Sequence, residues 1–329
     1  IYATATIFSS LLLIWIGKKI DEYQIIYYSF FVIFLLFFSS LFFSFINSIY
    51  FLAAGIFLIR FSGQGLMSHT STTTISRFFV KSRGKALSTI WFGLSSAEFI
   101  LPVLITYLFA IYSWRSVWQG IAIIIIFFLP FVIFKTIKTI KLESREIEQN
   151  SKMSLEIKSW RRKEVIKDYR FYIISLNMLA MPWIATGVFV YQSFISDSKM
   201  WNIFTIPKAF MIYSIASIIT LFFSGFLVDK YSSRKLISLM NIPLLFAMFV
   251  LMYYQHEVSA YIFLGLIGVS NGLANVLGSS TWAEIYGVKF IGSIKALTTA
   301  FMVFSTAFGT AVFGLLIDNG FTIEKIAFI

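Results

Sequence analysis

Arg60 and Glu98 are the two charged residues whose positions in long apolar segments point most directly to chemistry. Arg60 lies in segment 49–77, about 16 Å from the end at residue 49 if the segment is a helix. Glu98 lies in segment 85–112, about 21 Å from the end at residue 112, which is expected on the same side of the membrane. A charge at that depth in a membrane costs a few kcal/mol or more unless it is paired or faces a polar cavity. Three interpretations stay open: a structural ion pair, an Arg60 that binds an anionic solute, and a Glu98 that carries a proton.

His69 and Lys295 are the other ionisable candidates. His69 falls on the opposite side of its helix from Arg60, among small or hydroxylic residues, a composition that favours close helix packing over proton transfer, although both remain open. These neighbours are Ser62, Gly65, Thr72, Thr73 and Ser76. Lys295 lies about 8 Å inside a helix expected to start near residue 290, which favours snorkelling to the membrane surface over a buried role.

The elements that must position these residues are membrane-spanning helices. Only 13% of the 329 residues are charged and 58% are hydrophobic, whereas a soluble domain carries about 25% charged residues. A spanning helix needs about 20 apolar residues. Runs of this kind predict about ten spans, at 1–16, 25–46, 49–77, 85–112, 116–135, 170–195, 204–228, 235–254, 258–283 and 290–317.

The basic residues set the expected orientation. Most of the 27 Lys and Arg residues fall in loops on one side of these spans, so that side is expected to be cytoplasmic. The net charge of +12 is therefore a topology signal and not a nucleic-acid patch. We expect a multi-pass protein of the cytoplasmic (inner) membrane, surrounded by lipid and monomeric. Because Ile1 begins inside an apolar run, a fragment lacking one helix at each end is expected.

Several classes of site are disfavoured by composition. There is no cysteine, which excludes disulfides and thiolate metal sites, and the two histidines are too few for a histidine-rich metal or haem site. No catalytic set of the Ser/His/Asp or His-Glu-x-x-His kind appears. We therefore expect no metal, no cofactor and no enzymatic activity. If the protein is not a transporter, the alternative functional class is a membrane-embedded enzyme or a polytopic receptor.

An internal repeat predicts the domain organisation. Residues 2–23 align with 210–231 at an offset of 208 positions, and both copies run toward the cytoplasmic side. The identities are Ser9/Ser217, Leu13/Leu221, Gly17/Gly225, Asp21/Asp229 and Tyr23/Tyr231. Two copies in one orientation predict an all-α membrane protein of two parallel-repeat halves. Residues 1–141 and 169–329 are the expected halves, and 142–168 is the expected cytoplasmic linker.

Three motifs resemble the major facilitator superfamily, in particular its monocarboxylate-transporter-like and oxalate/formate-antiporter-like branches. The first is Gly17-x-x-x-Asp21, repeated as Gly225-x-x-x-Asp229 with Arg234 after it. The second is Arg60 with Gly63, Gln64 and Gly65. The third is Arg83-Gly84-Lys85-Ala86. The resemblance implies family helices 2–6 and 7–11, about ten of twelve.

The resemblance also implies roles. It predicts a gating latch of Gly17, Asp21, Gly225, Asp229 and Arg234, in which each aspartate meets the N-terminus of a helix starting near residue 85 or 290. The alternative is that these acids only balance nearby lysines. The helix from about 258 is expected to line the cavity. The substrate or coupling candidates are then Arg60, Gln64, His69, Glu98, Asn271, Asn275 and Lys295.

The expected function is secondary active transport by alternating access, as a symporter or antiporter. A small organic anion such as a monocarboxylate, with protons as the coupling ion, is the leading substrate. Drug or metabolite efflux and sugar transport are the alternatives within the superfamily.

Overall fold

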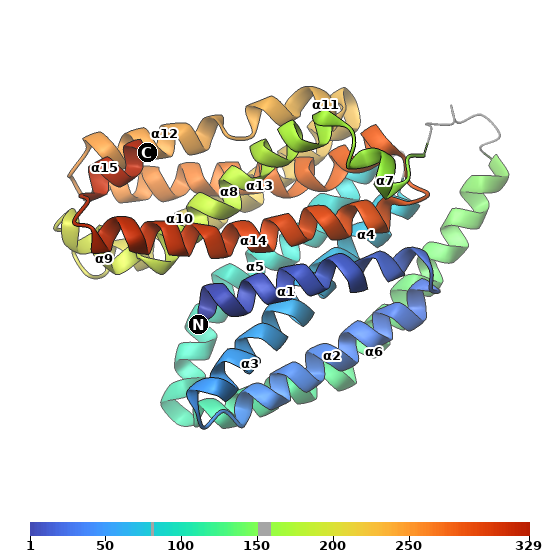
Figure 1. Ribbon diagram of the computed structural model, residues 1–329, viewed down its shortest axis with the longest axis horizontal. Coiled ribbons are helices and arrows are strands. Elements are labelled where there is room, and N and C mark those ends of the chain that lie inside the picture. Colours follow the sequence, from blue (N-terminus) through green and yellow to red (C-terminus); the bar gives the residue numbers. More distant parts are fainter. Residues whose placement is uncertain (80–81, 151–158) are drawn as a thin grey trace. The chain divides into compact units, whose positions relative to one another are not determined.

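The protein is helical in the part of the chain that the computed structural model describes, which is 1–79, 82–150 and 159–329 (Figure 1). Nine helices of these residues are long and apolar enough to cross a membrane. The segment expected as a span at 85–112 is α5, Arg83–Ile111, which is not among these nine. Without water, every backbone polar group must be bonded internally, and helices satisfy this requirement.

The elements follow the apolar runs closely. In chain order they are α1 (Tyr2–Ile16), a 3₁₀ turn (Gly17–Asp21), α2 (Ile25–Ser44), α3 (Ile49–Ile59), a π-helix (Arg60–Met67), α4 (Ser68–Phe78), α5 (Arg83–Ile111), α6 (Trp114–Asn150), α7 (Arg162–Val165), α8 (Tyr169–Val190), α9 (Gln192–Ser198), α10 (Thr205–Tyr231), α11 (Ser233–Leu236), a second 3₁₀ turn (Ile237–Leu239), α12 (Ile242–Tyr253), α13 (Val258–Tyr286), α14 (Ile291–Asp318) and α15 (Ile323–Phe328).

Two details differ from the expected spans. The expected linker, 142–168, begins as the end of α6 and includes α7, while 151–158 lies outside the described residues. The expected span 235–254 is divided into α11, a 3₁₀ turn and α12, and Pro243 lies in the first turn of α12. A proline is tolerated there because the first N–H groups of a helix have no intrahelical acceptor.

The chain forms two compact units. Unit 1 comprises Ile1–Val80, Leu104–Asp168 and Trp282–Val303, and unit 2 comprises Lys81–Val103, Tyr169–Thr281 and Phe304–Ile329. Each unit therefore contains segments from both sides of the expected linker. The division into halves at 1–141 and 169–329 stays a prediction.

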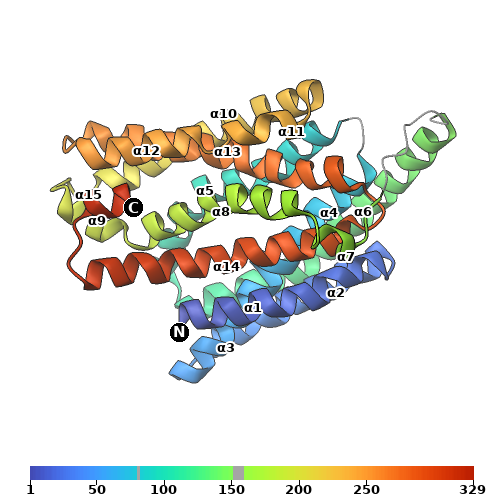
Figure 2. The ribbon, with the colours of Figure 1, turned by 45° about the horizontal axis from the view of Figure 1, so that its top comes forward.

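Each unit has its own packing. In unit 1, α2 lies beside α6 (Figure 1), and α1, α2, the π-helix and the first part of α14 share a buried cluster that includes Leu13, Val32 and Ala300. In unit 2, α12 lies beside α13 (Figure 2), with Ala247 and Phe263 in one core. Large aromatic side chains are left uncovered outside these cores, as a lipid-facing surface requires.

Candidate functional site: two helix-start contacts and two polar clusters

Asp229, near the end of α10, binds the start of α5. Its Oδ1 accepts a hydrogen bond from the backbone N–H of Gly84 at 2.7 Å, and its Oδ2 accepts one from Lys85 at 3.1 Å. The first N–H groups of a helix lack intrahelical acceptors and carry the positive end of the helix dipole, so a carboxylate suits this position. The predicted position of Asp229 near Arg83–Ala86 is the one observed. We call this arrangement the Asp229 contact.

Asp21 makes the same arrangement within unit 1. Its Oδ1 accepts from the N–H of Gly292 at 3.0 Å and its Oδ2 from that of Ser293 at 2.6 Å, at the start of α14. Arg77 of α4 also forms an ion pair with Oδ1 of Asp21. We call this arrangement the Asp21 contact. Asp21 thus has a cationic partner, whereas no ion pair of Asp229 is found among the described residues.

The repeat relates the two contacts residue by residue. Asp21 and Asp229 are 208 positions apart, and so are their partners, Gly84 with Gly292 and Lys85 with Ser293. Gly84 and Gly292 thus extend the repeat beyond the stretch that the sequence comparison aligned. A Cβ at Gly84 would overlap the carbonyl oxygen of Gly225, and one at Gly292 would overlap Ile20 and Asp21. Glycine is required at both helix starts because another segment approaches so closely.

Arg60 is the first residue of the π-helix in unit 1. Its Nη1 donates to Oε1 of Gln64, one turn along, and its guanidinium lies over the ring of Tyr2 at 4.5 Å from the centroid. π-Helical turns are rare and concentrate at functional sites. The contacts hold the guanidinium in one orientation, and none of the described residues pairs it with a carboxylate.

Glu98 lies in unit 2 on α5, where Tyr213 of α10 hydrogen-bonds its carboxyl group. The other carboxyl oxygen, Oε2, is buried and has no hydrogen-bond partner among the described residues. A buried carboxylate oxygen without a donor is costly while it carries charge. The group is therefore suited to take up a proton.

Glu98 and the Asp229 contact belong to one antiparallel helix pair, the α5–α10 seam. Ser95 and Ser217 are hydrogen-bonded at 3.2 Å one turn from Glu98, and the rings of Phe92 and Phe222 lie 5.6 Å apart further along. The seam then reaches Gly84 and Asp229. It runs over 14 residues of α5, or about 21 Å.

Asn271 and Asn275 extend the polar cluster of the seam onto α13. Asn271 Nδ2 donates to Ser217 Oγ at 3.1 Å, and Asn275 Nδ2 donates to Asn271 Oδ1 at 3.3 Å. A Cβ at Gly268 would overlap the carbonyl oxygen of Tyr213, so α13 packs directly on the backbone of α10. The two amides are therefore organised by a chain of hydrogen bonds that begins at α5.

His69 and Lys295 are both buried in unit 1. Nε2 of His69 lies 2.9 Å from the carbonyl oxygen of Gly17, and Nζ of Lys295 donates to Ser76 Oγ at 3.0 Å. Lys295 is 3% exposed, so the predicted snorkelling of its ammonium group to the surface is not observed. Arg234, the remaining latch candidate, is exposed on α11.

A comparison with protein-family models decides the family. The model of the Major Facilitator Superfamily matches residues 1–310. The chain belongs to the major facilitator superfamily. It is accordingly a multi-pass secondary transporter of a small solute and not an enzyme.

A solved structure has the same superfamily fold. A bacterial homologue of the iron transporter ferroportin, crystallised in an outward-facing state, aligns with a TM-score of 0.63 and 15% sequence identity. The alignment covers 99% of this chain and 84% of that one. At this identity the likeness shows the fold alone. A search of curated protein sequences found no match.

Sequence reasoning about this superfamily member missed several residues that the fold brings to the candidates. These are Arg77, which binds Asp21, Tyr2, which lies against Arg60, and Tyr213, which binds Glu98. Tyr213 and Ser217, two polar residues one turn apart on α10, were the available signal for the seam. No local pattern indicates the partner of Asp21 on α4.

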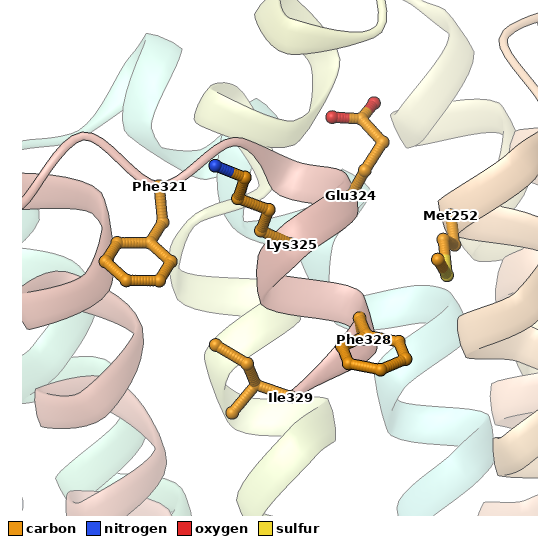
Figure 3. A pocket seen from close by; sticks show the side chains of 6 residues that line it. All are labelled: Met252, Phe321, Glu324, Lys325, Phe328 and Ile329. Carbon is orange, nitrogen blue, oxygen red and sulfur yellow. The ribbon is translucent and has the colours of Figure 1, made fainter.

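A surface hollow of about 330 Å³ lies elsewhere in unit 2, beside α15 (Figure 3). It is lined by Met252, Phe321, Glu324, Lys325, Phe328 and Ile329. None of the substrate or coupling candidates lines it. Mostly apolar side chains form it, and it carries no argument about the solute.

Proposed function

We propose that this superfamily member transports a small organic anion, with a monocarboxylate as the leading class, across the cytoplasmic membrane and couples this transport to protons. The observation that carries the proposal is the environment of Arg60. A partly buried guanidinium in a spanning segment is oriented by Gln64 and Tyr2, and no carboxylate of the described residues neutralises it. A solute carboxylate would supply the missing charge through two parallel N–H···O bonds.

Glu98 is the proposed proton site. Protonation would remove the cost of the buried oxygen that lacks a donor, while Tyr213 keeps the carboxyl group in place. Transporters commonly place such carboxyl groups within their spanning helices for this purpose. The alternative for both groups is an Arg60–Glu98 ion pair with a purely structural role.

The Asp21 and Asp229 contacts are the proposed gating latch. Each joins an aspartate to a helix start that is distant in sequence, by hydrogen bonds from backbone N–H groups that can break and re-form as the helices move. Alternating access needs such an element, stable in one state and absent in the other. The transporter is expected to act as a monomer.

Uptake into proteoliposomes tests the solute and the coupling ion. The purified protein is assayed with a panel of carboxylates, a neutral sugar and a cationic drug, each with and without an inward acid gradient. Uptake of a monocarboxylate that the gradient accelerates supports the proposal. Uptake of the sugar or the drug alone refutes it and favours the alternatives within the superfamily.

Variants of the two charges separate binding from structure. If Arg60 binds the anion, Arg60→Gln abolishes binding while the protein still folds, Glu98→Gln mainly changes the pH dependence, and the double variant stays inactive. If the two form a structural pair, each single variant loses stability by about 3–5 kcal/mol and the double variant recovers it. Lys208→Gln, at an exposed cation, is the matched control. Wild-type binding and uptake in all variants refute both roles.

A further inference from the structure

His69 is a fully buried side chain that the proposed transport cycle leaves without a role. Its Nε2 lies 2.9 Å from the carbonyl oxygen of Gly17, and its Nδ1 lies 3.4 Å from Oγ1 of Thr73. A carbonyl oxygen only accepts hydrogen bonds, so Nε2 carries the hydrogen and donates it. The strong contact of His69 is thus to a residue on another helix, at the base of the turn that bears Asp21.

That turn is irregular, unlike its repeat counterpart. Gly17–Asp21 is a 3₁₀ turn, whereas Asp229 lies within the regular α-helix α10. The hydrogen bonds of a 3₁₀ turn have poorer geometry than those of an α-helix, so they constrain the backbone less. The position of Asp229 is set by its own helix, while the position of Asp21 needs support from outside the turn.

The support comes from α4 at two points. His69 binds the first residue of the turn, and Arg77, two helical turns along α4, binds the carboxylate of its last residue, Asp21. On the other side of the turn, a Cβ at Gly17 would lie 2.8 Å from Cβ of Ala296 on α14. The start of the turn is therefore enclosed by α4 and α14.

We propose that His69 is a positioning residue of the latch: its Nε2–H holds the Gly17 carbonyl and so directs the Asp21 carboxylate at the start of α14. The inference rests on the proposed gating role of the Asp21 contact. The repeat gives an internal comparison, because the position equivalent to His69 is Leu277, and the Asp229 contact forms there without a histidine.

Distances between spin labels test this role. The chain has no cysteine, so Tyr23→Cys, after the turn, and Lys289→Cys, before α14, provide the only two thiols for labelling, and both side chains are exposed. Pulsed electron–electron double resonance on the purified protein then gives the distance distribution between the two labels. The short-distance fraction is the population in which the turn and the start of α14 are close together. Thermal stability is measured in parallel for every variant.

The expected result separates positioning from packing. His69→Leu, which carries the side chain of the other repeat, lowers the close population relative to the open one by about 3- to 10-fold, as the loss of one hydrogen bond predicts. His69→Gln retains a donor and stays near the wild type. Thr73→Val removes only the weaker contact and is the matched control. If His69→Leu fails to fold, His69→Asn, polar but too short to reach Gly17, is expected to show the same shift.

Two results would overturn the inference in distinguishable ways. Unchanged distances in His69→Leu or His69→Asn, together with a shift in Asp21→Asn, show that the histidine only packs and leave the proposed latch standing. Unchanged distances in Asp21→Asn show that the Asp21 contact does not hold the two segments, which refutes the latch and the positioning role together.

Discussion

Replacement of Asp229 by asparagine is the most direct perturbation of the proposed latch. The carboxylate accepts two backbone hydrogen bonds, at 2.7 and 3.1 Å, from Gly84 and Lys85. The asparagine side chain has a single acceptor oxygen, so one hydrogen bond is lost and its NH₂ group faces an N–H group. The favourable interaction of the charge with the helix dipole is lost as well.

These losses set the size of the effect. A hydrogen bond to a charged group contributes about 1.5–3 kcal/mol, and the dipole interaction about 0.3–1 kcal/mol. We expect a total near 2–3 kcal/mol, because the asparagine keeps one acceptor. At one power of ten for each 1.4 kcal/mol, the ratio of closed to open contact falls about 30- to 150-fold. Turnover in transport assays should slow more than solute binding weakens, because the equilibrium between states changes and the binding groups do not.

Spin labels on the α5–α10 seam measure the ratio directly. Thr89→Cys and Tyr231→Cys place labels at exposed positions on the two helices, in a chain that has no other thiol. Asp318→Asn, at an exposed aspartate outside both contacts, is the matched control. A distance distribution in Asp229→Asn that equals the wild-type one would refute the reasoning, since the two hydrogen bonds would then contribute nothing to the closed state.

Three further predictions concern stability. Gly84→Ala should lower the free energy of unfolding by about 1–3 kcal/mol, because its Cβ would overlap the carbonyl oxygen of Gly225. Gly120→Ala, where a Cβ meets nothing within 4 Å, is the control. Equal melting temperatures of the two variants would contradict the close approach at Gly84. Glu324→Gln should lower the free energy of unfolding by about 1–3 kcal/mol, because it leaves the fully buried ammonium of Lys199, 2.9 Å away, without its carboxylate. The loss is smaller than for a fully buried pair because the Glu324 side chain is 34% exposed. An unchanged melting temperature would argue against the ion pair. Partial burial opposes ionisation of Glu324, but the hydrogen bond and charge of Lys199, together with hydrogen bonds from the Glu324 backbone and the Thr322 side chain, outweigh it and lower the pKa of Glu324 to about 2. Its contribution to stability should therefore be complete above the unfolded pKa of about 4.3 and disappear as the pH falls toward 2. A melting temperature with the same pH dependence in wild type and Glu324→Gln would contradict this assignment.

The sequence was informative about features that depend on composition and local order. Hydropathy located nine of the expected spans, since a spanning segment needs only length and apolar residues, while α5 is not among the helices of the described residues that meet this criterion. The repeat at an offset of 208 positions and the resemblance placed Asp229 at the start of α5, where the structure also places it. The roles of the charged candidates stay predictions.

What tertiary structure alone decided is which side chains meet. The hydrogen bond between His69 and Gly17 joins residues from different helices, and so do the hydrogen bond of Tyr213 to Glu98 and the ion pair of Arg77 with Asp21. Spacing along one helix predicts neighbours three or four residues apart, but it carries no information about the rotation or depth of one helix against another. Those are set by packing of small and large side chains across the whole interface, such as Gly268 against the backbone of Tyr213. The sequence by itself therefore determined the approximate bounds of most spanning helices and the family, whereas packing determined which polar groups those helices bring together.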